Sequence, residues 1–255
     1  MAEQKPGALT VLWIVAAALL ALYVVLSVLA RRPDKESAAP QTAPSGSSVY
    51  ERCVKRALDK LLSFFGLVLL SPVFAFTALL IFADDPGPVL FRQKRVGKDR
   101  SLFALHKFRS MKQSAPHDVP THLLEDPERY ILRSGRFIRR SSLDELPQLW
   151  DIFRGKMSVI GPRPALWNQD DLIAEREKYG ANGVLPGLTG WAQVNGRDEL
   201  EIAEKARLDG VYVQALRCGG FAAMSMDARC FFKTILSVVR RDGVLEGEQD
   251  KGEKT

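Results

Sequence analysis

Two long uncharged hydrophobic runs dominate the first third of the chain. The first extends from Ala8 to Ala30 and is long enough to cross the ~30 Å hydrocarbon layer of a membrane as a helix. Two arginines follow it directly, and basic residues after a span favour retention on the cytoplasmic side. We therefore expect residues 1–7 to be a short tail and this run to be an uncleaved anchor with its N-terminus outside. A signal peptide cleaved after Val28-Leu29-Ala30 is the alternative.

The second hydrophobic run, from Leu61 to Ala83, also has the length of a membrane span. Basic residues lie on both sides of it, so both flanks are predicted to be cytoplasmic. Ser71-Pro72 stands in its middle, where proline removes a helix hydrogen bond and bends the helix. The pattern favours a broken, re-entrant helix that enters and leaves the membrane on one face. An ordinary span with a tolerated proline is the alternative.

The remaining pattern divides the chain into further segments. Residues 31–49 are rich in Pro, Ser, Ala, Gln and Thr, which is typical of a flexible linker. Residues 50–83 form the juxtamembrane and re-entrant segment. A cytoplasmic domain is expected over residues 84–241, and a polar tail over residues 242–255.

Shorter periodic patterns predict the elements of this domain. Two strands, Val89–Gln93 and Leu102–Phe108, should be joined near Gly97. The last helix is amphipathic, which suits either a membrane surface or a protein core. The fold class is therefore α+β and mostly helical. The expected helices are Glu128–Arg139, Leu143 to about Arg154, Gln169–Tyr179, Leu200–Val213 and Phe221–Arg240.

The net charge limits the classes of binding partner, and the cysteine content limits the kinds of site, that this chain is expected to have. A net charge of +6 and a pI of about 9.3 suit phosphate groups, nucleotides or an anionic membrane surface. Nucleic acid is not expected, because no recognition helix, zinc finger or aromatic RNA-binding signature is visible. Cys53, Cys218 and Cys230 are far apart and odd in number, so neither a disulfide framework nor a zinc site is indicated.

The most informative motif is the run from Arg139 to Leu149. It places Asp144 and Glu145 beside basic residues and ahead of an apolar helical face. Ser142-x-x-Glu145 is typical of a capping box, and the helix dipole favours carboxylates in a first turn, so the motif alone favours a structural interpretation. Catalysis on a phosphate would use the same residues, since a carboxylate can attack or hold a metal while cations neutralise phosphate oxygens.

Three further motifs carry cations or glycines. In Gly161-Pro162-Arg163-Pro164 two prolines fix the backbone around an arginine, whose planar fork matches phosphate oxygens. A rigid turn with a solvated arginine is equally consistent with it. The segment from Pro186 to Arg197 contains three glycines, a weak signal for close approach to a ligand. Lys107 and Arg109 add two cations at a strand end.

Together these motifs resemble those of the monotopic phosphoglycosyl transferases, the bacterial sugar transferase family. The resemblance covers about Val54 to Arg241 and favours the catalytic interpretation of Asp144 and Glu145. Leu185 and Gly210 depart from it, because a basic residue and a bulkier residue are usual at those positions. The matching motifs are Lys55-Arg56 with Asp59, Ser71-Pro72, Phe91-Arg92-Gln93-x-Arg95-x-Gly97, Lys107–Met111, Arg139–Leu149, Gly161–Pro164, Pro186–Arg197 and Leu208-Asp209-x-x-Tyr212.

The resemblance implies a monotopic membrane enzyme that starts a surface glycan at the bacterial inner membrane, with its catalytic domain in the cytoplasm. It would transfer a phosphosugar from a UDP-sugar to undecaprenyl phosphate and release UMP. The lipid bilayer, a second copy in a homodimer and downstream glycosyltransferases are the further partners it suggests.

The resemblance also implies roles for single residues. Asp144 would be the nucleophile that forms a phosphosugar-aspartyl intermediate, and Glu145 would bind Mg²⁺. Asp209 and Gln148 match further site positions, whose roles stay open. Five basic residues match positions for the substrate phosphates: Arg139, Arg163, Arg197, Lys107 and Arg109.

Overall fold

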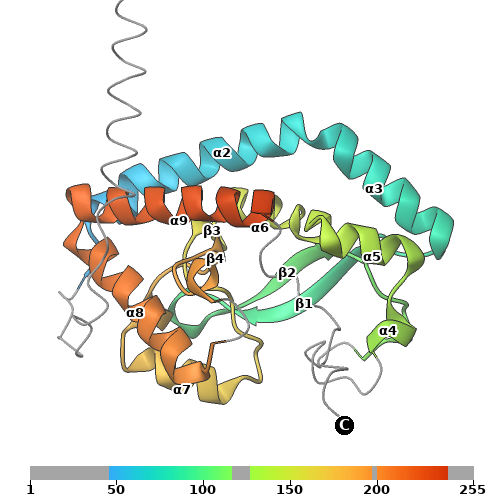
Figure 1. Cartoon of the computed structure of the whole chain (residues 1–255). Helices are drawn as coiled ribbons and strands as arrows, with labels where there is room; N and C mark the ends of the chain where they lie inside the picture. The colour runs from blue at the N-terminus through green and yellow to red at the C-terminus, as the bar shows by residue number, and fades with distance from the viewer. Residues whose placement is uncertain (1–45, 117–126, 197–199, 241–255) are drawn as a thin grey trace, which may run out of the picture.

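The computed structural model describes residues 46–116, 127–196 and 200–240. The expected anchor at Ala8–Ala30, nearly all of the linker, Arg197 and the tail from residue 242 lie outside the described residues. Within them the chain is mostly helical, with two small two-stranded sheets (Figure 1). The prediction of a mostly helical α+β fold is confirmed.

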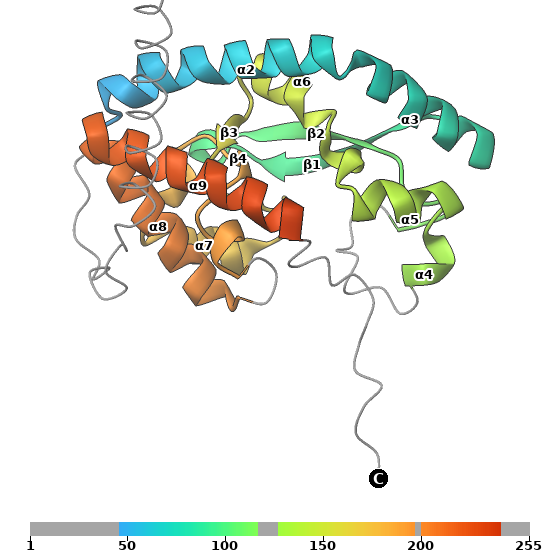
Figure 2. The ribbon, with the colours of Figure 1, turned by 45° about the horizontal axis from the view of Figure 1, so that its top comes forward.

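A bent pair of helices forms one long side of the molecule (Figures 1 and 2). Helices α2 (Arg56–Leu69) and α3 (Ser71–Asp84) meet at Leu70 and are bent by 60°. Pro72 stands in the first turn of α3, where its missing N–H costs no helical hydrogen bond. The Ser71 hydroxyl donates to the Val68 carbonyl at 2.8 Å. The break expected at Ser71-Pro72 is confirmed.

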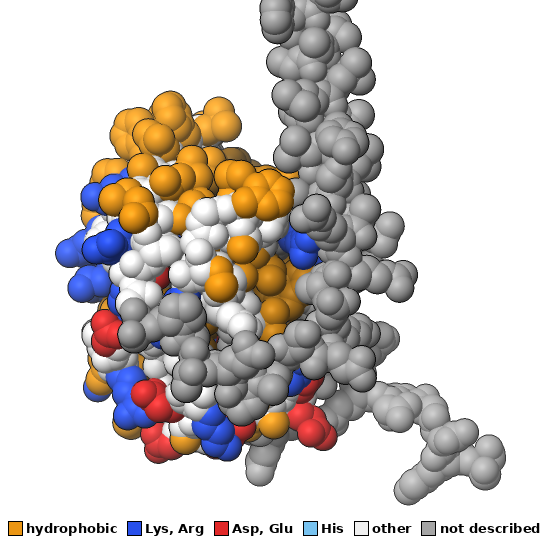
Figure 3. All heavy atoms as spheres, turned by 90° about the vertical axis from the view of Figure 1, so that its left-hand side faces the viewer, with side chains coloured by type: hydrophobic (Ala, Val, Ile, Leu, Met, Phe, Trp, Pro, Cys, Tyr) orange, Lys and Arg blue, Asp and Glu red, His pale blue; other side chains and the backbone are white. Residues whose placement is uncertain are grey.

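The outer face of this pair is strongly hydrophobic. Leu69, beside the bend, is 78% exposed, and Phe65 and Leu79 are exposed on the two arms. Figure 3 shows hydrophobic side chains gathered along the upper edge of the molecule. Among the described helices none is by itself long and apolar enough to cross a membrane, whereas the bent pair has the length and composition of a broken span or a re-entrant loop.

A buried carboxylate fastens the beginning of the bent pair to the body. Asp227 on α9 (Gly220–Arg240) lies 2.8 Å from the ammonium of Lys55, which ends the π-helical turn Tyr50–Lys55 before α2. It also accepts hydrogen bonds from the hydroxyls of Tyr50 and Tyr212, at 3.0 and 2.9 Å. Because an unpaired charge is costly to bury, this cluster holds the helix start in one place.

A second buried carboxylate attaches α2 to a small parallel sheet. The sheet consists of β3 (Ser158–Ile160) and β4 (Gly187–Thr189). Asp59 on α2 accepts a hydrogen bond from the Ser158 hydroxyl at 3.0 Å and another from the Val159 N–H at 2.9 Å. Asp59, the acidic residue of the Lys55-Arg56…Asp59 motif, therefore links the bent pair to a sheet that lies about a hundred residues later in the sequence.

The predicted hairpin is confirmed, with a longer first strand. Strands β1 (Leu90–Val96) and β2 (Leu102–Phe108) are antiparallel and are joined through the turn after Gly97. Asp151 on α6 (Gln148–Phe153) fixes that helix against β2, since its carboxylate accepts the His106 N–H at 2.9 Å and lies 2.7 Å from the His106 ring nitrogen Nδ1.

Two predicted helices were wrong in extent. The helix expected over Glu128–Arg139 is split into α4 (Pro127–Tyr130) and α5 (Arg133–Arg140). The split arises because Ile131 pairs with Met111 and the Leu132 N–H bonds to the Ser110 carbonyl, as in a strand. The helix expected from Leu143 is split as well, into a 3₁₀ turn (Leu143–Glu145) and the short α6.

The remaining helices lie where they were expected, with shifted ends. Helix α8 (Ile202–Cys218) packs closely against the residues that follow α7 (Asp170–Glu177). A Cβ on Gly210 of α8 would stand 2.7 Å from the Cβ of Tyr179, two residues beyond the end of α7. The departure from the family pattern at Gly210 thus makes room for an aromatic residue. Helix α9 (Gly220–Arg240) has a buried and an exposed apolar face. Ala223, Met226 and Cys230 are buried in the core, as expected of a core helix. The membrane-surface alternative stays a prediction, and the apolar side chains exposed on the opposite face are Phe221, Met224, Phe231, Ile235 and Leu236.

Replacing Asp227 by asparagine should strongly destabilise the protein. The change leaves the Lys55 ammonium buried without its counter-charge, which costs about 3 kcal/mol or more in the free energy of unfolding. Denaturation of the purified protein measures it. Lys178→Gln is the matched control, since it removes an exposed ion pair with Glu175 and should change the stability by less than about 1 kcal/mol. Equal stability of the Asp227→Asn variant and the unchanged protein would contradict the role given to this cluster.

Candidate active site

A cleft of about 670 Å³ opens beside the hairpin, a volume usual for small-molecule sites. Its walls are β1, the end of β2 and the following loop at residues 109–116. Arg139, at the end of α5, and Asp144 complete the lining. Of the described lining residues six are basic and one is acidic, so the cleft favours an anionic ligand.

The two adjacent carboxylates are presented by an unusual turn. Ser142 adopts a left-handed conformation with φ of 54°, and the short 3₁₀ turn Leu143–Glu145 follows it. The Ser142 side chain makes no capping hydrogen bond, so the predicted capping box is wrong. Left-handed backbone turns Ser142 away from the geometry of an N-cap, and Glu145 bonds to cations instead of to the helix start.

Glu145 is held by two cations from distant parts of the chain. Its Oε1 accepts a hydrogen bond of 2.8 Å from the Arg163 guanidinium and one of 3.1 Å from the Lys107 ammonium. Burial raises the pKa of Glu145, but Arg163 and Lys107 outweigh that effect and hold its pKa well below the ordinary range. Glu145 is therefore ionised at neutral pH and holds both cations in place.

Asp144 lies in a different electrostatic environment. Its Oδ2 is 3.5 Å from the Lys107 ammonium, and its side chain is 14% exposed. Burial raises the pKa of Asp144, and the neighbouring Glu145 adds to the rise, while Lys107, Arg139 and Arg163 oppose it. A carboxylate with a raised pKa is more basic, and one that faces a cleft is placed to react with a ligand there.

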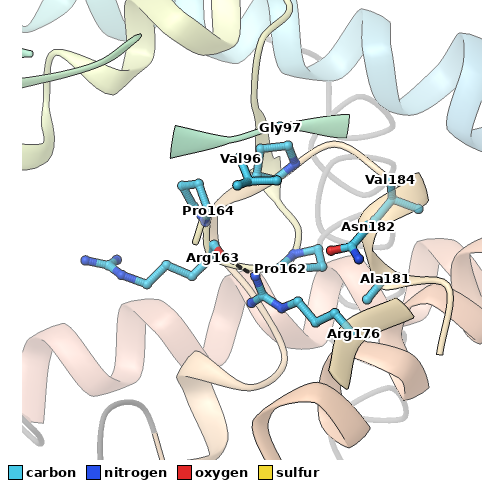
Figure 4. A pocket seen from close by; sticks show the side chains of 10 residues that line it. Val96, Gly97, Pro162, Arg163, Pro164, Arg176, Ala181, Asn182 and Val184 are labelled. Carbon is cyan, nitrogen blue, oxygen red and sulfur yellow. Dashed lines mark hydrogen bonds between the residues drawn. The ribbon is translucent and has the colours of Figure 1, made fainter. Parts of the chain in front are cut away.

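The loop that carries Arg163 is held from behind by a buried ion pair. Arg176 on α7 donates to the Arg163 carbonyl at 2.9 Å and lies 2.6 Å from the Asp209 carboxylate on α8. Figure 4 shows the Arg163 side chain directed away from the small pocket that Arg176 and Pro162 border. Asp209 was predicted as a site position; it is buried behind Arg163 and does not line the cleft.

The same loop is held from the front by β1. The Arg95 guanidinium donates to the Pro164 carbonyl at 3.0 Å, and the Val96 N–H donates to the Ala165 carbonyl at 3.0 Å. Underneath, the Gly161 N–H bonds to the Thr189 carbonyl, and a Cβ at Gly187 would overlap the Gly161 backbone. Gly187 of the 186–197 segment therefore serves close backbone packing against Gly161, at the start of the loop.

The other predicted site residues lie at different distances from the carboxylates. Arg109 lines the cleft, but its guanidinium is buried and lies 2.9 Å from the Asp85 carboxylate. Gln148 is buried at the start of α6 and does not line the cleft. Arg139 lines the cleft on the side of Asp144. The position of Arg197 is outside the described residues.

Sequence reasoning did not single out Arg95 and Arg176, which hold the two sides of the Arg163 loop. Arg95 belonged to a recognised motif, but nothing in its spacing named a partner. Arg176 sits on the helix expected over Gln169–Tyr179, in which most residues are polar or charged, and its side chain is only 6% exposed. The sequence of that helix does not show that position 176 faces the interior, which is the information needed to predict the contact of Arg176 with Asp209.

Hydrophobic neighbours connect the carboxylate pair to the bent helices. Leu143 and Leu146, on either side of Asp144 and Glu145, pack with Phe74 and Ala78 of α3 against a common core cluster. Beyond them, Leu149 of α6 is close enough to α2 that a Cβ on Gly66 would come within 3.1 Å of it. The turn that carries the two carboxylates is therefore attached to the bent pair by apolar contacts.

Comparison with known proteins shows which family the chain resembles. The family model described as bacterial sugar transferase matches residues 50–241. The "UDP-glucose:undecaprenyl-phosphate glucose-1-phosphate transferase" of Escherichia coli K12 is 41% identical over 163 residues, which are 60% of this chain and 34% of that protein. The chain thus spans about a third of the length of that relative.

Shorter relatives match along almost their whole length. The "Exopolysaccharide production protein PSS" of Rhizobium leguminosarum bv. phaseoli is 38% identical over 202 residues, 74% of this chain and 96% of that protein. The "Uncharacterized sugar transferase EpsL" of Bacillus subtilis is 34% identical over 193 residues, 76% of this chain and 91% of that protein. With the family model covering most of the described chain, the protein belongs to the bacterial sugar transferase family.

Proposed function

We propose that this protein is a phosphoglycosyl transferase that moves a phosphosugar from a UDP-sugar to undecaprenyl phosphate and releases UMP. The observation that carries the proposal is the position of Asp144 on the wall of a basic cleft. Beside it, Glu145 accepts hydrogen bonds from Lys107 and Arg163. The names of the E. coli and other relatives, which specify undecaprenyl phosphate and sugar phosphates, supply the substrate classes.

The reaction proceeds in two displacements at one phosphorus atom. An Asp144 oxygen attacks the phosphorus that carries the sugar, and the bond from that phosphorus to the bridging oxygen of the diphosphate breaks. UMP leaves with the bridging oxygen and its electron pair, and Asp144 becomes a phosphosugar ester. A phosphate oxygen of undecaprenyl phosphate then attacks the same phosphorus, and the Asp144 carboxylate is restored. Neither step transfers a proton.

The surrounding cations suit this chemistry. Lys107 and Arg163 lie beside the attacking carboxylate and can neutralise charge on the phosphoryl oxygens, as preorganised cations do in phosphoryl transfer. Because Glu145 fixes both cations, their positions do not have to be rearranged when the donor enters. Arg139 and Arg197 are proposed as further contacts to the substrate phosphates.

The carboxylate pair also fits a magnesium ion. Among the described residues no three His, Cys, Asp or Glu side chains are grouped as a metal cage. Mg²⁺ is usually bound by one or two carboxylates together with substrate phosphates and water, and Asp144 and Glu145 would supply the carboxylates of such a set. When bound by Glu145 and the donor diphosphate, Mg²⁺ would neutralise negative charge on the leaving UMP.

The bent helix pair is proposed to enter the membrane and leave it on the same face. Its outer side chains are exposed and apolar, and its bend separates two arms that are each too short to cross. Because Leu143 and Leu146 pack against α3, such an insertion would bring Asp144 close to the lipid phosphate acceptor. The protein would then work at the cytoplasmic side of the bacterial inner membrane.

Asparagine at position 144 should abolish turnover without unfolding the protein. The amide is nearly the same size as the carboxylate but cannot act as the nucleophile, so UMP release should fall about a thousandfold or more. The assay measures UMP with a UDP-sugar, Mg²⁺ and undecaprenyl phosphate. Asp170→Asn, an exposed site on α7, is the control and should leave the rate unchanged. A rate near that of the unchanged protein would remove Asp144 from the reaction.

The acid limb of the pH–activity profile should respond to Lys107. The ionised form of Asp144 is the attacking form, and burial raises the pKa of that carboxyl while Lys107 lowers it. Lys107→Met removes the lowering charge, so the pH below which kcat/KM falls should move upward, in addition to a lower maximum. A downward move of the acid limb would contradict the assignment.

The two ends of the bent pair should lie on the same side of the membrane. In inside-out vesicles a membrane-impermeant maleimide should label both the exposed native Cys53 and a cysteine introduced by Pro86→Cys. Peptide mass spectrometry separates the two sites from Cys218. A pair that crosses the membrane would instead protect one of them in these vesicles and expose it in right-side-out vesicles.

A further inference from the structure

Arg95 is a cation of the cleft that the chemistry described above does not use. It lies on β1, lines the cleft together with Asp144, and belongs to a motif found by sequence but without an assigned role. The other five basic residues of the described lining differ from it, and one of them, Arg139, is already proposed above as a contact to the substrate phosphates. Arg92 and Lys112 are exposed, and Lys107 and Arg109 lie beside carboxylates.

Neutral oxygen atoms hold the Arg95 guanidinium in place. Its Nε and Nη2 donate to the Gln93 side-chain oxygen at 3.1 and 2.6 Å, and its Nη1 donates to the Pro164 carbonyl at 3.0 Å. These bonds use three of the five N–H donors of a guanidinium. Gln93 and Pro164 therefore orient the fork and leave donors on a group that lines the cleft.

The electrostatic surroundings of Arg95 favour an anion. Burial and the adjacent Arg163 together lower the pKa of Arg95 to about 10, and Glu145 only partly opposes them. The guanidinium still carries its charge at neutral pH, so a positive charge is kept at a site that disfavours it. A ligand with negative charge at the cleft would relieve this cost, and a planar fork suits phosphate oxygens.

We propose that Arg95 is a donor-binding residue, which receives an oxygen of the nucleotide-sugar diphosphate through the N–H groups not used by Gln93 and Pro164. The inference rests on the function proposed above and adds a second fixed guanidinium beside Arg163. Because Arg95 is held by Gln93 and Pro164, and the Arg163 guanidinium by Glu145, the diphosphate would meet two arginines whose positions are already set.

Calorimetric titration of the purified full-length protein with UDP tests this assignment. Arg95→Gln should weaken UDP binding about tenfold to a hundredfold, the loss expected for a charged hydrogen bond. Arg95→Lys, which keeps the charge and loses the fork, should bind with intermediate affinity. Uridine, which has no phosphate, should bind the unchanged protein and both variants alike.

Lys94→Gln is the matched control. Lys94 is the neighbouring cation on β1, is exposed, stacks over Trp167 and does not line the cleft, so its loss changes the net charge equally and should leave UDP affinity unchanged. Melting temperatures without ligand check the fold of each variant. If Arg95→Gln does not fold, Arg95→Lys decides, and wild-type UDP affinity in that variant would overturn the assignment.

The outcomes separate this inference from the proposed function. Unchanged UDP affinity in Arg95→Gln, with normal sugar-phosphate transfer by the unchanged protein, overturns the inference alone. A raised KM for undecaprenyl phosphate with unchanged UDP affinity also overturns it, by assigning Arg95 to the lipid phosphate. Weakened UDP binding in a protein that transfers no sugar phosphate supports the inference and removes the proposed function. An unchanged protein that binds no UDP overturns both.

Discussion

Glu145 joins three parts of the chain that lie far apart in sequence. One of its oxygen atoms accepts hydrogen bonds from Lys107 on β2 and from Arg163 in the loop before α7, so hairpin, turn and loop meet at one atom. A carboxylate in this environment is ionised because of those cations, and the cations keep their positions because of it. Asp144 is the adjacent residue along the chain and also lies beside Lys107. The contacts of Glu145 therefore also help to fix Asp144 on the wall of the cleft.

The surrounding charges place the two adjacent carboxylates, Asp144 and Glu145, in different environments. Glu145 holds Arg163 and Lys107 through one oxygen, Oε1, whereas Asp144 faces a cleft with a clear excess of positive charge. A nucleotide diphosphate would meet cations that are already oriented, so little reorganisation would accompany binding. Apolar contacts from Leu143 and Leu146 to α3 connect this polar site to the most hydrophobic face of the protein.

Local patterns carried much of the fold. The proline break, the hairpin and the approximate positions of α7, α8 and α9 follow from signals within a few residues. The features that were predicted wrongly depend on partners far away in the sequence. Ser142 and Glu145 match a capping box, but Glu145 accepts hydrogen bonds from Lys107 and Arg163 instead of bonding to the start of the helix. Likewise the contacts of Arg176 with Asp209 and of Asp59 with Val159 join residues that periodicity cannot pair. The motif residues of the cleft could be named from sequence, while the arginines that fix their loop could not.

The central claim is that Asp144 becomes esterified by sugar phosphate, and mass spectrometry of the donor-treated protein tests it most directly. The protein is incubated with a UDP-sugar and Mg²⁺ without undecaprenyl phosphate, quenched and digested. The account predicts a mass increase of one sugar phosphate on the peptide that contains Asp144, with UMP released in proportion. An adduct on another side chain, or no adduct in a preparation that releases UMP when the acceptor is added, would contradict it.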